Sequence, residues 1–235
     1  MSEVHRWERD GLADPAASGV REGLTESELA PTPWQQASAW LADAQRAGAL
    51  GQLAEPTTMA VATVDAQGLP DVRAVLMRFF TPAGPGFVTS ARSVKAAHIA
   101  ANPVLAAALT WPSLFRAIRF RGAAVTIDPA ETGAYWRQRP WGSKISAWAS
   151  RQSAPIGSRA DLEAEVARLA STWPERDGQN EVPVPPDWIG YRIECDEVEL
   201  WAGRRDRLHD RFRFTRVGPG DLDTPAAWSR VRLQP

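Results

Sequence analysis

Alternating apolar and polar positions run along much of the chain and predict a series of short strands. The first covers residues 59–64, and a turn at residues 65–68 separates it from a second strand at residues 72–80. Glycine and proline then predict a loop at residues 82–86. The other predicted strands cover residues 87–90, 104–110, 116–127, 191–200, 208–216 and 228–233.

A helical period of apolar positions separates several of these strands. Thr32 can cap the first predicted helix, Pro33 suits its first position, and Gln35 can complete a capping box. Antiparallel-looking strands with helices between them predict an α+β fold with a barrel-like sheet. The predicted helices cover residues 33–47, 93–101, 128–138 and 158–173, and a proline-rich loop covers residues 182–186.

The domain organisation expected from composition is simple. Residues 1–30 are polar, mixed in charge and without apolar periodicity, so we expect a mobile N-terminal arm. Neither a break in composition nor an internal repeat divides residues 31–235, so we expect one domain there.

Composition then narrows the class of partner and the compartment. The chain has 235 residues and a formal net charge of −1, so we expect neither nucleic acid nor an anionic membrane as a partner. It has no run of about 18 apolar residues that would span a membrane. Cys195 is the single cysteine, which rules out an intramolecular disulfide and is typical of a core residue in this alternating stretch. We expect a cytoplasmic protein.

Several catalytic motifs are missing from the sequence. There is no glycine-rich phosphate loop and no serine in a nucleophile elbow. His5, His98 and His209 do not have the spacing of metal ligands, so no metal is expected. Positive charge lies instead in arginines spread along several strands, such as Arg119 and Arg121. This distribution suits an anionic ligand bound across a sheet.

The segment 201–211 combines the residue types that an anion-binding, proton-handling site needs. Trp201 supplies a large aromatic surface, Arg207 and Arg211 supply forked cations, and His209 titrates near neutral pH. A solvated basic hairpin is the alternative reading of the same segment.

Taken together, collinear segments from about residue 32 to the end resemble the pyridoxine (pyridoxamine) 5′-phosphate oxidase family. The resemblance implies an FMN-binding split β-barrel with peripheral helices, and a homodimer with FMN at the subunit interface. It also implies oxidation of pyridoxine 5′-phosphate or pyridoxamine 5′-phosphate to pyridoxal 5′-phosphate, with O₂ as electron acceptor. The matching segments are RAVL (73–76), SVKA (93–96), YWRQRP (135–140), Ser143, AWASRQS (147–153), VPVP (182–185), WIGY (188–191), RLHDR (207–211) and RLQP (232–235).

The resemblance implies a set of cofactor-binding residues. Lys95 falls in the first turn of a predicted helix, where free amides already favour an anion such as the FMN phosphate. A surface lysine is the alternative for Lys95, and a plain core residue is the alternative for Trp201. Gln152 and Ser153 are expected to reach the flavin from the neighbouring subunit. The full implied set is Arg73 on the phosphate or ribityl chain, Val88, Thr89 and Lys95 at the phosphate, Gln152, Ser153, and Trp201 and Arg211 at the isoalloxazine ring.

The resemblance also implies a substrate site. Tyr135, Arg139 and Ser143 would bind the substrate phosphate, and the first two lie one helical turn apart. A surface Tyr–Arg stack is the alternative. Arg207 and His209 would lie over the pyridine ring as the catalytic pair, and on a strand they would share a face. Arg78 would join the substrate site where the family commonly has a lysine.

Three further positions depart from the family pattern. Val94 stands in place of an arginine that assists the FMN phosphate, Ala117 in place of a glutamine that reaches the flavin, and Val88 in place of a tyrosine. Each lost polar contact weakens FMN binding by about 1 kcal/mol. Two alternatives therefore stay open: a related flavin-dependent oxidase acting on a secondary-metabolite amine or dihydro-aromatic, as in phenazine biosynthesis, and a non-catalytic module that binds a flavin or a vitamer.

Overall fold

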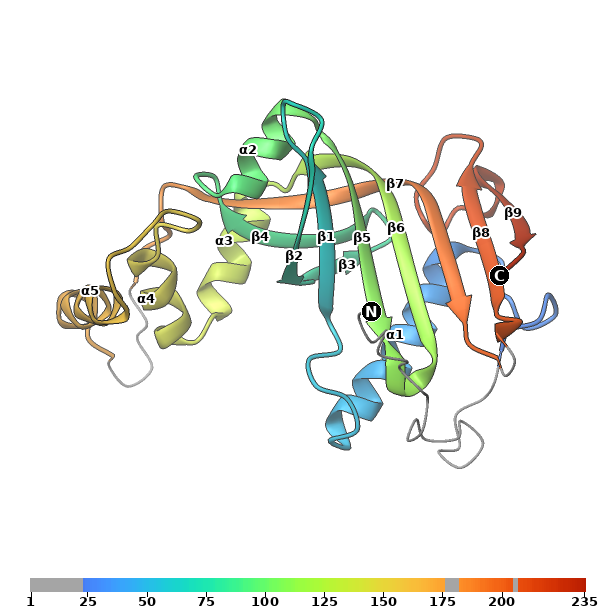
Figure 1. The fold of residues 1–235 in the computed structure, drawn as a ribbon, viewed down its shortest axis with the longest axis horizontal. Coiled ribbons are helices and arrows are strands. Elements are labelled where there is room, and N and C mark those ends of the chain that lie inside the picture. The colour runs from blue at the N-terminus through green and yellow to red at the C-terminus, as the bar shows by residue number, and fades with distance from the viewer. Residues whose placement is uncertain (1–22, 176–181, 205–206) are drawn as a thin grey trace, which may run out of the picture.

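The computed structural model describes residues 23–175, 182–204 and 207–235, and within these ranges a curled antiparallel sheet forms the centre of the molecule (Figure 1). The strand order is β2-β1-β5-β6-β7-β4-β3, and β8 and β9 continue from β7. The strands are β1 (Thr58–Val64), β2 (Pro70–Leu76), β3 (Phe79–Thr81), β4 (Gly84–Ser90), β5 (Val104–Trp111), β6 (Arg116–Thr126), β7 (Trp188–Ala202), β8 (Asp210–Arg216) and β9 (Trp228–Leu233).

The helices lie around this sheet, with α3, α4 and α5 grouped beyond one end of it and α1 below it (Figure 1). Thr32 caps α1 as expected, because its hydroxyl accepts a hydrogen bond from the Gln35 amide at 3.2 Å. The predicted capping box is wrong, since the Gln35 side chain donates to Asp223 at 3.0 Å instead. The helices are α1 (Pro33–Ala49), α2 (Val94–Ala101), α3 (Pro129–Gln138), α4 (Trp141–Ala149) and α5 (Arg159–Thr172).

The long strand β7 organises the sheet. Its first residues pair with β4, its last residues pair with β8, and β6 runs along its other edge. A strand of 15 residues spans roughly 45 Å when extended. Residues at the two ends of β7 therefore belong to different regions of the molecule.

The core combines buried residues of the strands with the buried face of α1. On β6 the predicted division of faces is confirmed, because Ile118 and Phe120 are fully buried while Arg119 and Arg121 are exposed. Cys195 is also buried, and burial raises the pKa of its thiol to about 12, as expected of an unreactive core cysteine. A smaller hydrophobic core packs α3, α4 and α5 together. Its buried residues are Trp136, Ile145, Ala149, Leu169 and Val182.

The structure also differs from other sequence predictions about the fold. The expected strand at residues 72–80 divides into β2 and β3, because the Met77 amide bonds to Thr57 and the Arg78 amide turns to Gly86. Helix α4 was not expected at all. Residues 23–30 are not a mobile arm, since Leu24 and Leu29 are buried; the rest of the expected arm lies outside the described residues.

Two features are absent from the described residues. None of their helices is long and apolar enough to cross a membrane. Their His, Cys, Asp and Glu side chains do not form a group that could hold a metal ion.

Candidate functional site

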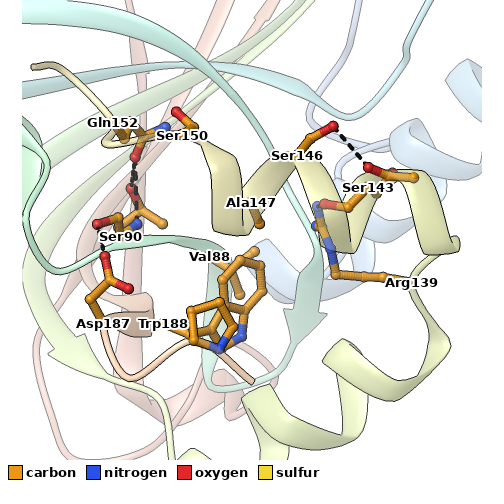
Figure 2. A pocket seen from close by; sticks show the side chains of 13 residues that line it. Val88, Ser90, Arg139, Ser143, Ser146, Ala147, Ser150, Gln152, Asp187 and Trp188 are labelled. Carbon is orange, nitrogen blue, oxygen red and sulfur yellow. Dashed lines mark hydrogen bonds between the residues drawn. The ribbon is translucent and has the colours of Figure 1, made fainter. Parts of the chain in front are cut away.

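Two adjoining cavities lie where β2, β4, α2 and α4 meet. The larger, of about 770 Å³, runs along β2 and reaches the start of α2. The smaller, of about 410 Å³, lies between β4, α4 and the start of β7 (Figure 2). The residues lining both cavities are Val88, Thr89, Arg139, Ser143 and Gln152, so the two form one continuous site.

A buried lysine lies at the end of the larger cavity. Lys95, which is only 6% exposed, donates from Nζ to the Thr89 hydroxyl and to the Gln152 side-chain oxygen, both at 3.2 Å. Within the described part of the chain these two neutral oxygens are its hydrogen-bond partners. Burial, and then the charge of Arg73, lowers the pKa of Lys95. An ammonium that is buried without a carboxylate is ready to bind an anion.

The start of α2 adds further donors to this cavity. Ser93 caps the helix, and the Val94 amide donates to the Ser153 hydroxyl at 3.3 Å. Gln152 and Ser153 were expected to arrive from the neighbouring subunit. That expectation is wrong for this cavity, because they line it in the same chain as Thr89 and Lys95.

Arg73 and Arg78 line the larger cavity from β2 and from the residues that follow it. Arg73 donates to the Thr63 hydroxyl at 2.7 Å and to the Val61 carbonyl at 3.1 Å, and it pairs with Asp71. These contacts fix the direction of its guanidinium. Arg78 is exposed at the cavity and brings a second positive charge.

The structure brings the expected phosphate-binding trio together at the end of α3. Arg139 donates to the Tyr135 hydroxyl at 3.4 Å and to the backbone carbonyl of Ser143 at 3.0 Å. Its guanidinium also lies 5.1 Å from the centre of the Trp188 ring. Figure 2 shows Arg139 and Ser143 on one side of the smaller cavity, with Trp188 below it. Tyr135 supports Arg139 without lining either cavity.

A second cluster lies at the other end of β7 and consists of Trp201, Arg207, His209 and Arg211. The His209 ring lies 4.6 Å from the Trp201 ring, and its Nδ1 accepts a hydrogen bond from the Arg204 amide at 3.1 Å. Arg207 is exposed and has a φ of 62°. Arg207 and His209 both precede β8, so the expectation that they share one face of a strand is wrong.

The buried carboxylate of Glu199 holds Arg211 of this second cluster. Both Nε and Nη2 of Arg211 donate to Glu199, at 3.0 and 2.7 Å, and Arg119 donates to the other oxygen of Glu199 at 2.6 Å. Sequence reasoning missed Glu199. Its signal is the spacing of two from Trp201 on a strand, which places both side chains on one face.

Among the described residues, this second cluster does not meet the two cavities within one chain. Trp201, Arg207, His209 and Arg211 are absent from the linings of both cavities. Trp188, beside the smaller cavity, begins β7 and pairs with Ser90, whereas Trp201 near its end pairs with Ala117. We call the residues that line the two cavities the cavity half. The group Trp201, Arg207, His209 and Arg211 is the loop half.

Comparison with known proteins identifies the family. Residues 48–173 match the family model described as pyridoxamine 5′-phosphate oxidase, and residues 188–235 match the pyridoxine 5′-phosphate oxidase C-terminal dimerisation region. A pyridoxine/pyridoxamine 5′-phosphate oxidase from Streptomyces avermitilis is 42% identical over 231 residues, which are 97% of this chain and 99% of the relative. The chain belongs to the pyridoxine/pyridoxamine 5′-phosphate oxidase family.

Two proteins from one organism, Burkholderia lata, are also similar to this chain. A pyridoxine/pyridoxamine 5′-phosphate oxidase from Burkholderia lata is 41% identical over 95% of this chain and 99% of the relative. The crystal structure of PhzG from the same organism, in complex with tetrahydrophenazine-1-carboxylic acid, is 28% identical, has a TM-score of 0.78 and covers 92% of this chain and 100% of that one. The structural match confirms the α+β split-barrel class expected from the sequence.

The cavity half of this oxidase-family chain contains residues that the sequence did not single out. Ser146, Ser150 and Asp187 line the smaller cavity. Although burial raises it, hydrogen bonds from Arg92 and Ser90 hold the pKa of Asp187 below its ordinary value. Ser146 lies in α4 and Ser150 directly follows it, so a sequence signal for them required that helix to be recognised.

Proposed function

We propose that this chain is the FMN-dependent oxidase that converts pyridoxine 5′-phosphate or pyridoxamine 5′-phosphate to pyridoxal 5′-phosphate. The observation that carries the proposal is a pair of cationic positions in one continuous site. Lys95 is buried there beside neutral oxygens, and Arg139 lies across the same cavity on an aromatic support. One position suits the phosphate of a nucleotide cofactor, and the other suits the phosphate of a small substrate.

The cavity half has the donors that an FMN phosphate needs. Lys95, the Thr89 hydroxyl and the start of α2 surround one end of the larger cavity, and Arg73 lies along its wall. Gln152 and Ser153 supply further polar groups toward the flavin from the same chain. When bound, FMN supplies a two-electron acceptor that O₂ regenerates, with hydrogen peroxide as the product.

Arg139, Ser143 and Arg78 would bind the phosphate of the substrate. Tyr135 and Trp188 hold the Arg139 guanidinium from one side, so little side-chain entropy remains to be lost on binding. The smaller cavity leaves room for the pyridine ring beside Val88. In this arrangement the protein orients the carbon that bears the alcohol or amine. That carbon would lose a hydride while the attached oxygen or nitrogen loses a proton, and water would hydrolyse the imine formed from the amine to the aldehyde with release of ammonia.

The loop half would complete the site over the substrate and the flavin ring. Because a backbone N–H donates to His209 Nδ1, the neutral imidazole carries its proton on Nε2. His209 can then donate from Nε2 toward the substrate, while Arg207 stabilises negative charge. Trp201 and Arg211 would lie along the isoalloxazine ring.

A second copy of the chain would supply the loop half to each cavity. Residues 188–235 match the family's dimerisation region, and they include both the long strand β7 and the loop half. In a two-fold dimer the loop half of each subunit can lie over the cavity half of the other, and two equivalent composite sites result.

Subunit complementation tests the composite site. Arg139→Ala damages the cavity half and Arg207→Ala damages the loop half, and at vitamer concentrations well below the wild-type KM each homodimer should have little activity. In a mixed dimer one site carries both lesions and the other carries neither. Random mixing of the two variants therefore restores about a quarter of wild-type activity, because half of the dimers are mixed and half of their sites are intact. No recovery in verified mixed dimers would refute the composite site.

A paralogous oxidase acting on a dihydro-aromatic remains the second candidate, because the PhzG structure matches nearly the whole chain. The higher identity to the Burkholderia lata vitamer oxidase than to PhzG favours the vitamer. Turnover of FMN-loaded protein with each vitamer, measured as pyridoxal 5′-phosphate formed, decides between them. A yellow protein that forms no product and is not bleached by either vitamer without oxygen would contradict the proposed function.

A further inference from the structure

Asp210 follows His209 directly and is the point where three distant segments of the chain meet. Its side chain is only 8% exposed. Its Oδ2 accepts a hydrogen bond from the Leu24 amide at 2.9 Å and another from Arg204 Nε, and its Oδ1 accepts from Arg232 Nη1. One carboxylate therefore binds Leu24 in the N-terminal segment, Arg204 just after β7 and Arg232 in the last strand.

Arg204 connects Asp210 to His209. Its Nε donates to Asp210, and its backbone amide donates to His209 Nδ1. Gly203 is fixed from both sides, since its amide donates to Phe115 at 2.7 Å and its carbonyl accepts from Gly23 at 3.2 Å. These hydrogen bonds hold the backbone at residues 203 and 204 in place before the substrate binds.

The outer partner of Asp210 is itself held in place. Arg232 donates to both carboxylate oxygens of Glu26, at 2.6 and 2.9 Å, and its guanidinium lies 4.4 Å from the Phe212 ring centre. Although burial raises it, the hydrogen bonds from Leu24, Arg204 and Arg232 hold the pKa of Asp210 below its ordinary value. Asp210 is thus an anion over the whole neutral range, which the two arginines require.

We infer that Asp210 is a positioning residue of the oxidase: through Arg204, whose amide donates to His209 Nδ1, it fixes the tautomer and the direction of His209. This inference rests on the proposed function for the role of His209. The N-terminal segment takes part in the same positioning, because the Leu24 amide donates to Asp210. We expect the effect on the chemical step, because the phosphate binds at the cavity half.

Asp210→Asn is the main variant. It keeps an acceptor for the Leu24 amide but removes the charge and one of the two oxygens that the arginines share. We expect kcat to fall by about tenfold or more while KM for the vitamer phosphate and the FMN affinity stay within about threefold of wild type. Arg204→Gln, which leaves Asp210 with Leu24 and Arg232, should change kcat in the same direction to a smaller extent.

Asp223→Asn is the matched control. Asp223 also ties the N-terminal part of the chain to the C-terminal part, because it accepts from the Thr32 hydroxyl at 2.8 Å and from Gln35 at 3.0 Å. The partners of its side chain are Thr32 and Gln35, so Asp223→Asn leaves the contact between Asp210 and Arg204 in place. A fall in kcat in Asp223→Asn equal to that in Asp210→Asn would show general destabilisation and would overturn the inference.

A spectroscopic measurement tests the positioning without any turnover. With ¹⁵N-labelled histidine at about pH 9, well above an ordinary histidine pKa of about 6.5, the wild-type His209 should show the Nε2–H tautomer. His98, whose Nδ1 bonds to the Thr63 hydroxyl, serves as an internal reference. Asp210→Asn should shift His209 toward a mixture of tautomers and leave His98 unchanged.

The two kinds of measurement separate the inference from the proposed function. Wild-type protein that does not oxidise the vitamers refutes the function, and the tautomer measurement then decides the positioning role alone. Active wild type together with an Asp210→Asn variant of unchanged kcat and unchanged His209 tautomer refutes the positioning role alone.

Discussion

Lys95→Met separates the binding of FMN from the stability of the fold. Lys95 is 6% exposed and its Nζ is bonded only to the neutral oxygens of Thr89 and Gln152 in the described structure. Methionine keeps the apolar stem and removes the ammonium. We expect FMN affinity to fall strongly while the apoprotein loses no stability.

The expected loss of affinity follows from the burial of the ammonium. A hydrogen bond to a charged group contributes about 1.5–3 kcal/mol, and a unit charge about 4 Å away contributes about 4 kcal/mol at an effective dielectric constant of about 20. The two figures describe the same ammonium–phosphate contact and are not added, so a loss of about 2–4 kcal/mol raises the Kd for FMN about 30- to 700-fold. Titration followed by flavin fluorescence measures this change.

The expected effect on the apoprotein has the opposite sign. Burial, and then the charge of Arg73, lowers the pKa of Lys95 below its ordinary value of 10.5. The unfolded chain therefore binds this proton more tightly, so the charged lysine costs stability at neutral pH and the cost disappears as the pH rises from the folded pKa toward 10.5. Without FMN, Lys95→Met should unfold at the same or a higher temperature near pH 7, and its stability should rise less at alkaline pH.

Lys144→Met is the matched control for this experiment. Lys144 is 1% exposed, its Nζ donates to the Arg137 carbonyl at 3.1 Å, and burial followed by the charge of Arg139 lowers its pKa. It does not line the larger cavity. Its FMN affinity should match wild type. The reasoning fails if Lys95→Met binds FMN as wild type does, or if its apoprotein is clearly destabilised.

Four further outcomes follow from the structure. Arg139→Met should raise KM for the phosphorylated vitamer by about tenfold or more, because a charged hydrogen bond contributes about 1.5–3 kcal/mol; steady-state kinetics measures this, and an unchanged KM removes Arg139 from the phosphate site. Arg207→Ala should lower kcat far more than FMN affinity, and equal losses would place Arg207 at the cofactor instead. Val94→Arg should tighten FMN binding several-fold, by about 1 kcal/mol, and the gain should shrink at high ionic strength; an effect independent of salt would contradict a phosphate contact. Burial raises the pKa of the Cys195 thiol from 9.0 to about 12, so the folded state keeps a proton that the unfolded state loses, and this contribution to stability falls as the pH rises above 9.0. Wild type should therefore lose more stability than Cys195→Ala between neutral and alkaline pH, as measured by denaturant unfolding.

Local signals in the sequence were sufficient for most elements of the fold. Alternation predicted β1, β5 and β6, and capping residues predicted α1 and α3, because neighbouring residues alone determine these features. Helix α4 escaped prediction because Pro140 precedes it without a capping side chain. The break between β2 and β3 depends on a backbone hydrogen bond to the carbonyl of Gly86, a contact that the alternation of strand residues does not show.

The same limit applies to the site. Tyr135 and Arg139 lie one helical turn apart, and spacing alone was enough to pair them. Lys95 and Gln152 are 57 residues apart, and their contact required the fold. The resemblance to the family supplied both names but assigned Gln152 to the wrong subunit for this cavity.

The departures from the family pattern fall on both halves of the proposed composite site. Val94 is the first residue of α2 and lines the larger cavity, whereas Ala117 pairs with Trp201 in the loop half. Arg119 does not replace the missing contact, because Glu197 and Glu199 already bind its guanidinium. In a composite site both losses weaken the grip on one cofactor, each from a different subunit. FMN that binds only the assembled dimer stabilises that dimer by mass action, so the same two substitutions that weaken FMN binding also weaken the contribution of FMN to dimer stability.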